Sequence, residues 1–296
     1  MEFKTKPYED GVEISSAFRA GDSKTFVLHI PDEIDGLKVR SIGRGAFDII
    51  GRGAFDIRGL RNYLAMGGSV IEELQLPNTL RVIKEKAFRG HNIEEVTIPG
   101  NVQTIGEAAF RMCRIENLNI EKGVEIIKKD AFNTNDIKVL KLPETIKCIE
   151  TSAFERNQLK NVELPNSLVK VDNIFTFNYE IDTLRMPREK STLGSRTLYG
   201  ARADNVTLSE VTKLCDSSTF GAVEIKNLFI TGKIQGDVEL LSGPGVFIDN
   251  IVYTEDACVR KVEKLSSLTG AKIVYMLKRE VDDYLKDLKK IKEVFA

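Results

Sequence analysis

Few side chains in this sequence could carry catalysis. The chain has two histidines, His29 on an expected strand and His91 at an expected bend, so a Ser/His/Asp or Cys/His set would depend on one of them. No cluster of His, Cys, Asp and Glu shows metal-ligand spacing, and paired acids such as Glu94 and Glu95 indicate solvated faces. The sequence therefore predicts no enzyme activity, no metal site and no cofactor.

The cysteines add no further chemistry. They stand far apart and form no CxxC pair, which indicates free thiols and argues against a disulfide framework or a zinc site. They are Cys113, Cys148, Cys215 and Cys258.

Charge and hydropathy exclude several classes of partner. The 43 basic and 44 acidic residues alternate closely and leave a net charge of −1, so nucleic acid and anionic membrane surfaces are poor partners. No stretch approaches the roughly 18 apolar residues of a spanning helix, and no membrane insertion is expected. If Met1 is the native start, the protein is cytoplasmic; if a signal peptide has been removed, it is at the cell surface or secreted.

One apolar position recurs along the chain in steps of 22 residues, with a single step of 23. A fixed period in this range indicates stacked supersecondary units and hence a solenoid. The position is occupied by Leu74, Val96, Leu118, Leu140, Val162, Leu184, Val206, Leu228, Ile251 and Ile273.

Each unit reads LxxLxLP followed by VxxIxxxAF. Alternation at Val96 and Ile98 predicts a short strand with one buried face, and Pro99 ends it because proline cannot donate to a ladder. The second half returns an apolar residue and a phenylalanine to the interior, where stacking predicts an aromatic column. These phenylalanines are Phe88, Phe110, Phe132, Phe154 and Phe175.

A small side chain follows each of these phenylalanines by three residues. We expect these side chains to bond the backbone of the bend. They are His91, Cys113, Asn135, Asn157 and Asn178.

The pattern divides the chain into three parts. Residues 1–69 form an N-terminal cap with irregular first repeats and an octapeptide duplicated over 42–57, residues 70–275 form the solenoid, and residues 276–296 form an amphipathic helix. A further helix is expected over 255–268 and a last strand over 271–275. The terminal helix caps the last repeat or, alternatively, joins two copies of the chain.

The repeat resembles the BspA-type leucine-rich repeat, most strongly over residues 71–186. The segment from Leu28 to Gly43, with Ile-Asp-Gly in a longer turn, is similar to the opening repeat of that family. The resemblance implies an α/β-repeat solenoid: a leucine-rich repeat of about 22-residue units, short parallel β-strands on the concave face and a C-terminal helical cap. It also implies a non-enzymatic role in protein binding, commonly in cell-surface adhesion or host contact.

Residues flanking the recurring apolar position should form two outward columns on the concave face. Such a surface favours a protein or peptide partner, and its poverty in aromatic rings disfavours glycan or RNA. An intracellular scaffold that self-associates through its C-terminal helix is the alternative. The predicted binding residues are Glu73, Gln75, Glu95, Thr97, Asn117, Asn119, Val139, Lys141, Asn161, Glu163, Thr183, Arg185, Asn205, Thr207, Asn227 and Phe229.

Overall fold

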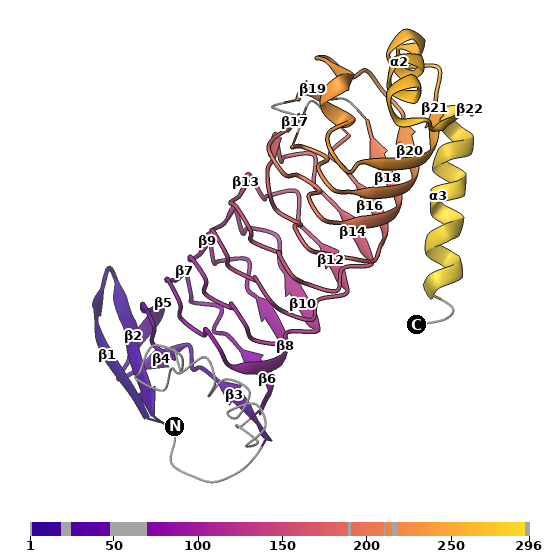
Figure 1. Cartoon of the computed structure of the whole chain (residues 1–296). Helices are drawn as coiled ribbons and strands as arrows, with labels where there is room; N and C mark the ends of the chain where they lie inside the picture. The colour runs from indigo at the N-terminus through magenta and orange to yellow at the C-terminus, as the bar shows by residue number, and fades with distance from the viewer. Residues whose placement is uncertain are drawn as a thin grey trace.

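The computed structural model describes residues 2–18, 25–47, 70–188, 191–209, 211–214 and 218–293. Successive turns of the chain stack into an elongated solenoid (Figure 1). Parallel pairing aligns Leu74 with Val96, and Leu140 with Val162 and Leu184. The 22-residue period and the predicted fold class are therefore confirmed.

One side of the solenoid carries the predicted strands, and we call this surface the long-strand face. Its strands lie in two parallel sheets that meet between β10 and β12. The first sheet contains β3 (Thr25–His29), β6 (Val70–Gln75), β8 (Asn92–Ile98) and β10 (Asn117–Ile120). The second contains β12 (Val139–Lys141), β14 (Asn161–Glu163), β16 (Ile181–Arg185), β18 (Arg202–Leu208), β20 (Glu224–Ile230), β21 (Phe247–Tyr253) and β22 (Lys272–Tyr275).

The other side carries a second set of parallel strands that the sequence did not predict. Most are two residues long, and an antiparallel hairpin of β1 and β2 starts the series. They are β1 (Glu2–Tyr8), β2 (Gly11–Phe18), β5 (Leu37–Ile42), β7 (Val82–Ile83), β9 (Thr104–Ile105), β11 (Ile126–Ile127), β13 (Cys148–Ile149), β15 (Lys170–Val171), β17 (Ser191–Leu193) and β19 (Val211–Leu214), with β4 (Glu33–Ile34) paired to β5.

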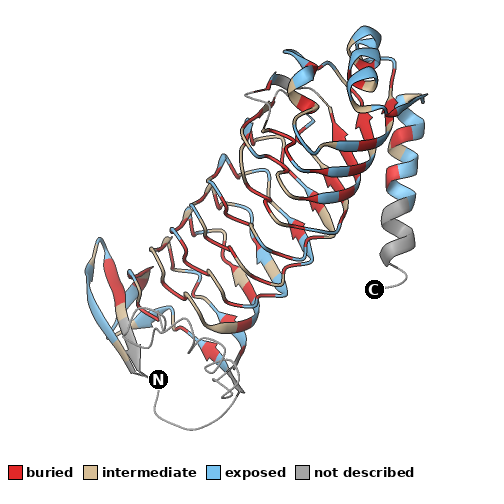
Figure 2. Ribbon diagram, in the orientation of Figure 1, coloured by how far each residue is buried: buried red, intermediate tan, exposed pale blue. Residues whose placement is uncertain are grey.

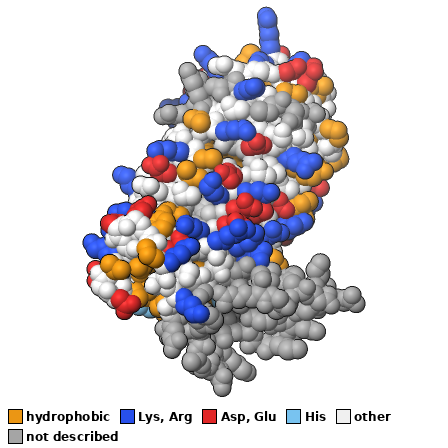
Figure 3. Space-filling model, turned by 90° about the vertical axis from the view of Figure 1, so that its left-hand side faces the viewer, with side chains coloured by type: hydrophobic (Ala, Val, Ile, Leu, Met, Phe, Trp, Pro, Cys, Tyr) orange, Lys and Arg blue, Asp and Glu red, His pale blue; other side chains and the backbone are white. Residues whose placement is uncertain are grey.

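This short-strand face is charged but balanced. Figure 3 shows basic and acidic side chains interspersed over it. Lys128 and Lys147 pair with acids of the neighbouring turns, Glu150 and Glu125, at 3.5 and 2.8 Å. Such exposed pairs contribute little stability each, and together they leave no large field of one sign.

The core lies between the two faces and is continuous along the solenoid (Figure 2). The expected column of phenylalanines is stacked from Phe47, one turn earlier than predicted, to Phe154, and Phe175 is buried without joining the stack of described rings. Ring centroids are 4.8 Å apart for Phe47 and Phe88 and 5.4 Å apart for Phe132 and Phe154, with interplanar angles of 15° and 7°. Offset stacking at this spacing adds attraction beyond the area that each ring buries.

The bends are held as predicted, by side chains that bond the backbone. Asn157 donates to the carbonyl oxygens of Phe132 and Phe154 at 3.0 and 3.1 Å, and its own oxygen accepts from the Ile137 amide at 3.2 Å. Asn135 and Asn178 repeat the arrangement. In Cys113, the thiol donates to the Phe88 carbonyl oxygen at 3.0 Å.

The C-terminal elements differ from the prediction in one respect. Helix α2 (Val259–Thr269) and β22 match the expected helix and last strand, and α2 closes the end of the solenoid together with η1 (Val238–Leu241). Helix α3 (Lys278–Glu293), expected to cap the last repeat, instead turns back beside the long-strand face (Figure 1).

The start of the duplicated octapeptide is ordered into the first turns, where Ile42 ends β5 and Phe47 joins the aromatic column. The rest of the duplication lies outside the described residues. The division of the chain at residues 69 and 275 stays a prediction.

Candidate protein-binding face

The sheet register places the predicted binding residues in two columns. Asn161, Thr183, Asn205 and Asn227 follow one another across β14, β16, β18 and β20 in the first column. Five neighbours form the same stretch of the second column: Lys141, Glu163, Arg185, Thr207 and Phe229. The structure therefore brings together residues that lie 22 positions apart in sequence.

The columns are open to solvent along the first strands, from β6 to β14. Thr97 and Asn161 are half-buried in this stretch, and its other members are exposed. The exposed residues are Glu73, Gln75, Glu95, Asn117, Asn119, Val139, Lys141 and Glu163. We call this stretch the open columns.

Farther along the sheet, the expectation of exposure is wrong. Thr183, Asn205, Thr207 and Phe229 are buried, with only 3%, 5%, 7% and 2% of their surface exposed. Arg185 and Asn227 are half-buried. The same residue positions that face solvent in the open columns are thus largely removed from it here.

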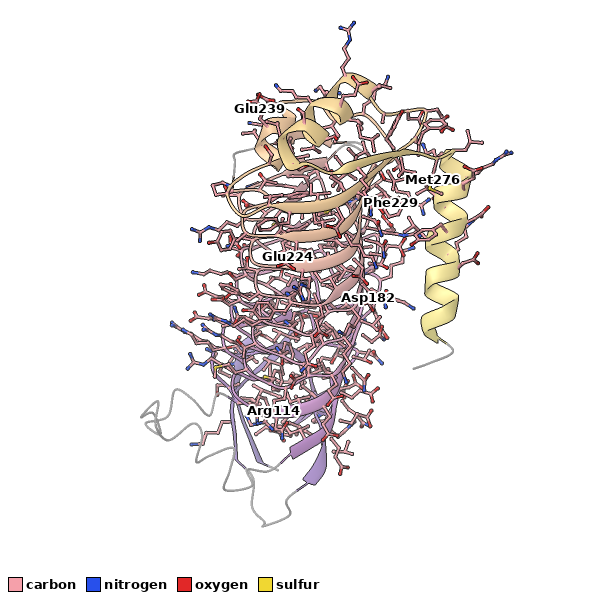
Figure 4. The ribbon with its side chains drawn as sticks, turned by 45° about the vertical axis from the view of Figure 1, so that its right-hand side comes forward. Arg114, Asp182, Glu224, Phe229, Glu239 and Met276 are labelled. Atoms are coloured by element: carbon pink, nitrogen blue, oxygen red, sulfur yellow. The ribbon has the colours of Figure 1, made fainter. Side chains whose placement is uncertain are left out.

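Helix α3 covers the last part of the second column. Phe229 and Val252 of the sheet form a buried cluster with Val281 and Leu285 of α3, and Met276 packs against it. The ring of Tyr284 lies 5.9 Å from that of Phe229. Figure 4 shows Phe229 and Met276 on the side where the helix and the sheet meet. Burial of these apolar side chains is the driving force for docking α3.

An asparagine ladder joins three residues of the first column. The amide nitrogen of Asn227 donates to the Asn205 side-chain oxygen, and that of Asn250 donates to Asn227, each at 3.0 Å. Asn205 in turn donates to the Asp182 carbonyl oxygen at 3.0 Å. These amides are satisfied by one another and are less available to a partner than Asn117 or Asn119.

An ion pair and a hydrogen bond hold the start of α3 against the turn after β21. The Lys278 ammonium lies 2.7 Å from the Asp256 carboxylate, and the Lys278 amide donates to Glu255 at 3.1 Å. The hydrogen bond from Lys278 holds the pKa of Asp256 below its usual range. Both contacts join α3 to the turn that follows β21.

Two pockets lie where the strands of this face end. One, of about 230 Å³, is lined by the last residues of β12, β14 and β16 and the residues that follow them, and includes Lys141, Glu144 and Arg188. The other, of about 240 Å³, lies between the sheet and α3 and includes Thr207, Lys278 and Asp282. Arg185, Met186 and Arg188 line both.

These geometric observations are joined by a match to a family model. The model of the BspA type leucine rich repeat region, in 6 copies, matches residues 61–178 and 125–236. The chain belongs to the BspA-type leucine-rich repeat family. BspA-type repeats are generally non-enzymatic scaffolds for protein interaction, so the family supports a protein-interaction repeat module.

One solved structure agrees with this fold, and a second resembles the chain more weakly. A leucine-rich repeat protein from Bacteroides ovatus is 22% identical, with a TM-score of 0.57 over 93% of this chain and 76% of that chain. The T. pallidum leucine-rich repeat protein TpLRR is 19% identical, with a TM-score of 0.41 over 78% of this chain and 84% of that one. A search of the curated proteins found no match.

In this BspA-type chain, both histidines contact residues of a neighbouring turn. His29 Nδ1 lies 3.1 Å from the Gln75 side-chain oxygen, and His91 contacts the Phe47 carbonyl oxygen at its bend. Within the described ranges, no group of three or more His, Cys, Asp or Glu residues could hold a metal ion. No helix in this part of the chain is both long and apolar enough to cross a bilayer.

None of the cysteines that the structure describes forms a disulfide. Cys113 is buried at a bend, and Cys148 and Cys258 are exposed. Cys215 lies outside the described residues.

Sequence reasoning named Arg185 and Thr207 as column residues but missed what distinguishes them. Both are largely buried, and both hold polar atoms that have no hydrogen-bond partner among the described residues. One residue in the sequence could have indicated this burial. Phe229 is aromatic in an otherwise polar column, and an apolar residue at such a position indicates that another element covers this part of the face.

Proposed function

We propose that this chain is a protein-interaction module that binds an extended peptide segment of a partner protein along the open columns. The observation that carries the proposal is the exposure of most residues in both columns from Glu73 to Glu163, beside a continuation that is largely buried, in part under α3. A chain that folds to cover one stretch of a sheet face leaves the exposed stretch as the surface available to a partner.

The composition of the open columns supports a peptide as the ligand. Amide, hydroxyl and carboxylate groups, with one ammonium on Lys141, can exchange hydrogen bonds with an extended backbone and its side chains. The columns offer no ring on which a sugar or a base could stack. The stacked turns present these groups at a regular spacing, which an extended chain can follow.

The test is selection of displayed random linear peptides against the intact chain, followed by affinity measurement with single variants. Asn119→Trp and Lys141→Glu place bulk and opposite charge in the open columns. We expect each to weaken the selected peptides at least about tenfold, as replacements at a binding hot spot do.

Lys147→Glu is the matched control, because Lys147 is an exposed lysine on the short-strand face. Equal affinities for all three variants, or a failure to enrich any peptide, would overturn the proposal. Circular dichroism melts of each variant separate loss of binding from loss of fold.

Cell-surface adhesion or host contact is the biological setting that we propose for this binding, in line with the family resemblance. Labelling of intact native cells with a membrane-impermeant reagent tests the setting separately. Labelling of this chain on intact cells supports the cell-surface setting. Labelling only after the cells are lysed contradicts that setting and favours an intracellular interaction module.

A further inference from the structure

Arg185 lies where the open columns end and the covered part of the face begins. Its neighbours in the second column are Glu163 of β14 and Thr207 of β18. Only 11% of the Arg185 side chain is exposed, and Thr207 is 7% exposed. A guanidinium shielded from water to this extent normally has its N–H groups paired, because burying a charged donor without a partner is costly.

The Arg185 guanidinium is left half-paired. Its Nη1 lies 3.8 Å from Glu163 Oε1, which is a long contact for an ion pair. Its Nε and Nη2 are buried without a hydrogen-bond partner in the described part of the chain. The hydroxyl of Thr207, next to it across the sheet, is in the same condition.

The unpaired nitrogens are the two that act together. In a guanidinium, the Nε and Nη2 hydrogens project side by side from one edge, and this edge takes both oxygens of a carboxylate. The same chain shows the arrangement filled: Arg40 holds Asp10 with Nε to Oδ1 at 3.0 Å and Nη2 to Oδ2 at 2.6 Å. Arg185 presents this edge without its carboxylate.

Two pockets whose linings carry net positive charge adjoin Arg185. The two pockets of about 230 and 240 Å³ share Arg185, Met186 and Arg188 as walls. The pocket beside α3 also has Thr207, Lys278 and Asp282 in its lining. Lys278 is held by Asp256, and Asp282 forms no ion pair with Arg185 within the described residues.

We propose that Arg185 and Thr207 form a carboxylate-binding subsite that receives an acidic group of the peptide bound along the open columns. The inference rests on the proposed function for the peptide that supplies the acidic group. The carboxylate-binding chemistry is argued from Arg185 and Thr207 alone. The Nε–Nη2 edge holds the carboxylate side-on, Thr207 donates its hydroxyl to the same group, and Arg188 adds positive charge at the pocket wall. The module thus prefers peptides that place one carboxylate at this end of the open columns.

A small probe tests the subsite without any peptide. The full chain, labelled with ¹⁵N, is titrated with sodium acetate while the Arg185 Nε–H resonance is followed by NMR, and sodium chloride at equal ionic strength is the reference. We expect a saturable shift with acetate only. Thr207→Val, which keeps the shape and removes the hydroxyl, should weaken acetate binding several-fold, whereas Arg114→Gln, at an exposed and distant site, should not.

Two results would overturn the subsite. One is an equal or non-saturating shift with both salts, which indicates ionic strength alone. The other is a change in the Arg185 resonance on Asp282→Asn without any acetate effect on the wild-type chain, which would show that α3 already supplies the carboxylate.

Selected peptides then separate this inference from the proposed function. Replacing each Asp or Glu of a bound peptide with Asn or Gln, and amidating its C-terminus, identifies the carboxylate that matters. We expect one of these changes to weaken the affinity of the peptide for the wild-type chain about tenfold or more. The same change should not weaken its affinity for the Arg185→Gln variant. Peptides that need the open columns but no carboxylate would defeat the subsite alone, and peptides indifferent to Asn119→Trp would defeat the proposed function alone.

Discussion

At the scale of single residues, the amide at each bend does more for stability than its small size suggests. Asn157 is 6% exposed and satisfies two carbonyl oxygens and one amide of the backbone. We expect Asn157→Ala to cost about 2–4 kcal/mol of unfolding free energy, because each buried group left unpaired costs about 1–3 kcal/mol. Asn119→Ala, at an exposed position, should cost under about 0.5 kcal/mol. Urea denaturation compares them, and similar losses would refute the role of the bend.

Glu13 of β2 gives the first turns a dependence on pH. Burial would raise the pKa of Glu13, but hydrogen bonds from Lys84, Lys6 and Ser41 outweigh burial and lower it. A carboxyl whose folded pKa is lowered stabilises the fold above its unfolded pKa, near 4.5, and loses that contribution as pH falls through the folded pKa. Hydrogen exchange of β2 and β5 amides should therefore show protection decreasing by up to about 1.4 kcal/mol per pH unit below that point. Glu13→Gln should reduce this slope, and an unchanged slope would assign it to other carboxyls.

At the scale of elements, the sequence predicts what its periodicity encodes. Alternation at Val96 and Ile98 is sufficient to place a long strand. A two-residue strand such as Val82–Ile83 has too few residues to alternate, so the short-strand face was missed. The apolar stripe of α3 could be read from the sequence, but the stripe does not indicate which surface of the protein it packs against. The two columns were predicted by spacing, whereas their burial depends on where α3 docks.

Docking of α3 on the long-strand face predicts how the chain behaves without it. Removing residues 276–296 exposes Phe229 and Val252 but leaves the core between the two faces intact. We expect a folded monomer of lower stability, because each buried Val or Leu contributes about 1.5–3 kcal/mol. Light scattering after gel filtration checks the mass, and a loss of oligomers would favour the scaffold alternative.

In the intact chain, Leu285→Ala should speed hydrogen exchange in α3, whereas Asp283→Ala, at an exposed position, should not.

At the scale of the whole molecule, stability depends on coupling between adjacent turns. The long-strand face is interrupted between β10 and β12 and the short-strand face between β13 and β15, so the two halves share fewer sheet bonds there. The Phe132 ring crosses the first interruption, stacked between Phe110 and Phe154 at 5.3 and 5.4 Å. Phe132→Ala should cost about 3–5 kcal/mol and leave a gap in the column at a point where only the short-strand sheet, through β11 and β13, still joins the turns. Calorimetry should then resolve two transitions in place of one.

Phe88→Ala is the control, because it removes an equally buried ring where the sheets are continuous. It should lower the temperature of a single unfolding transition. A single transition in both variants would show that the interruptions do not divide the solenoid.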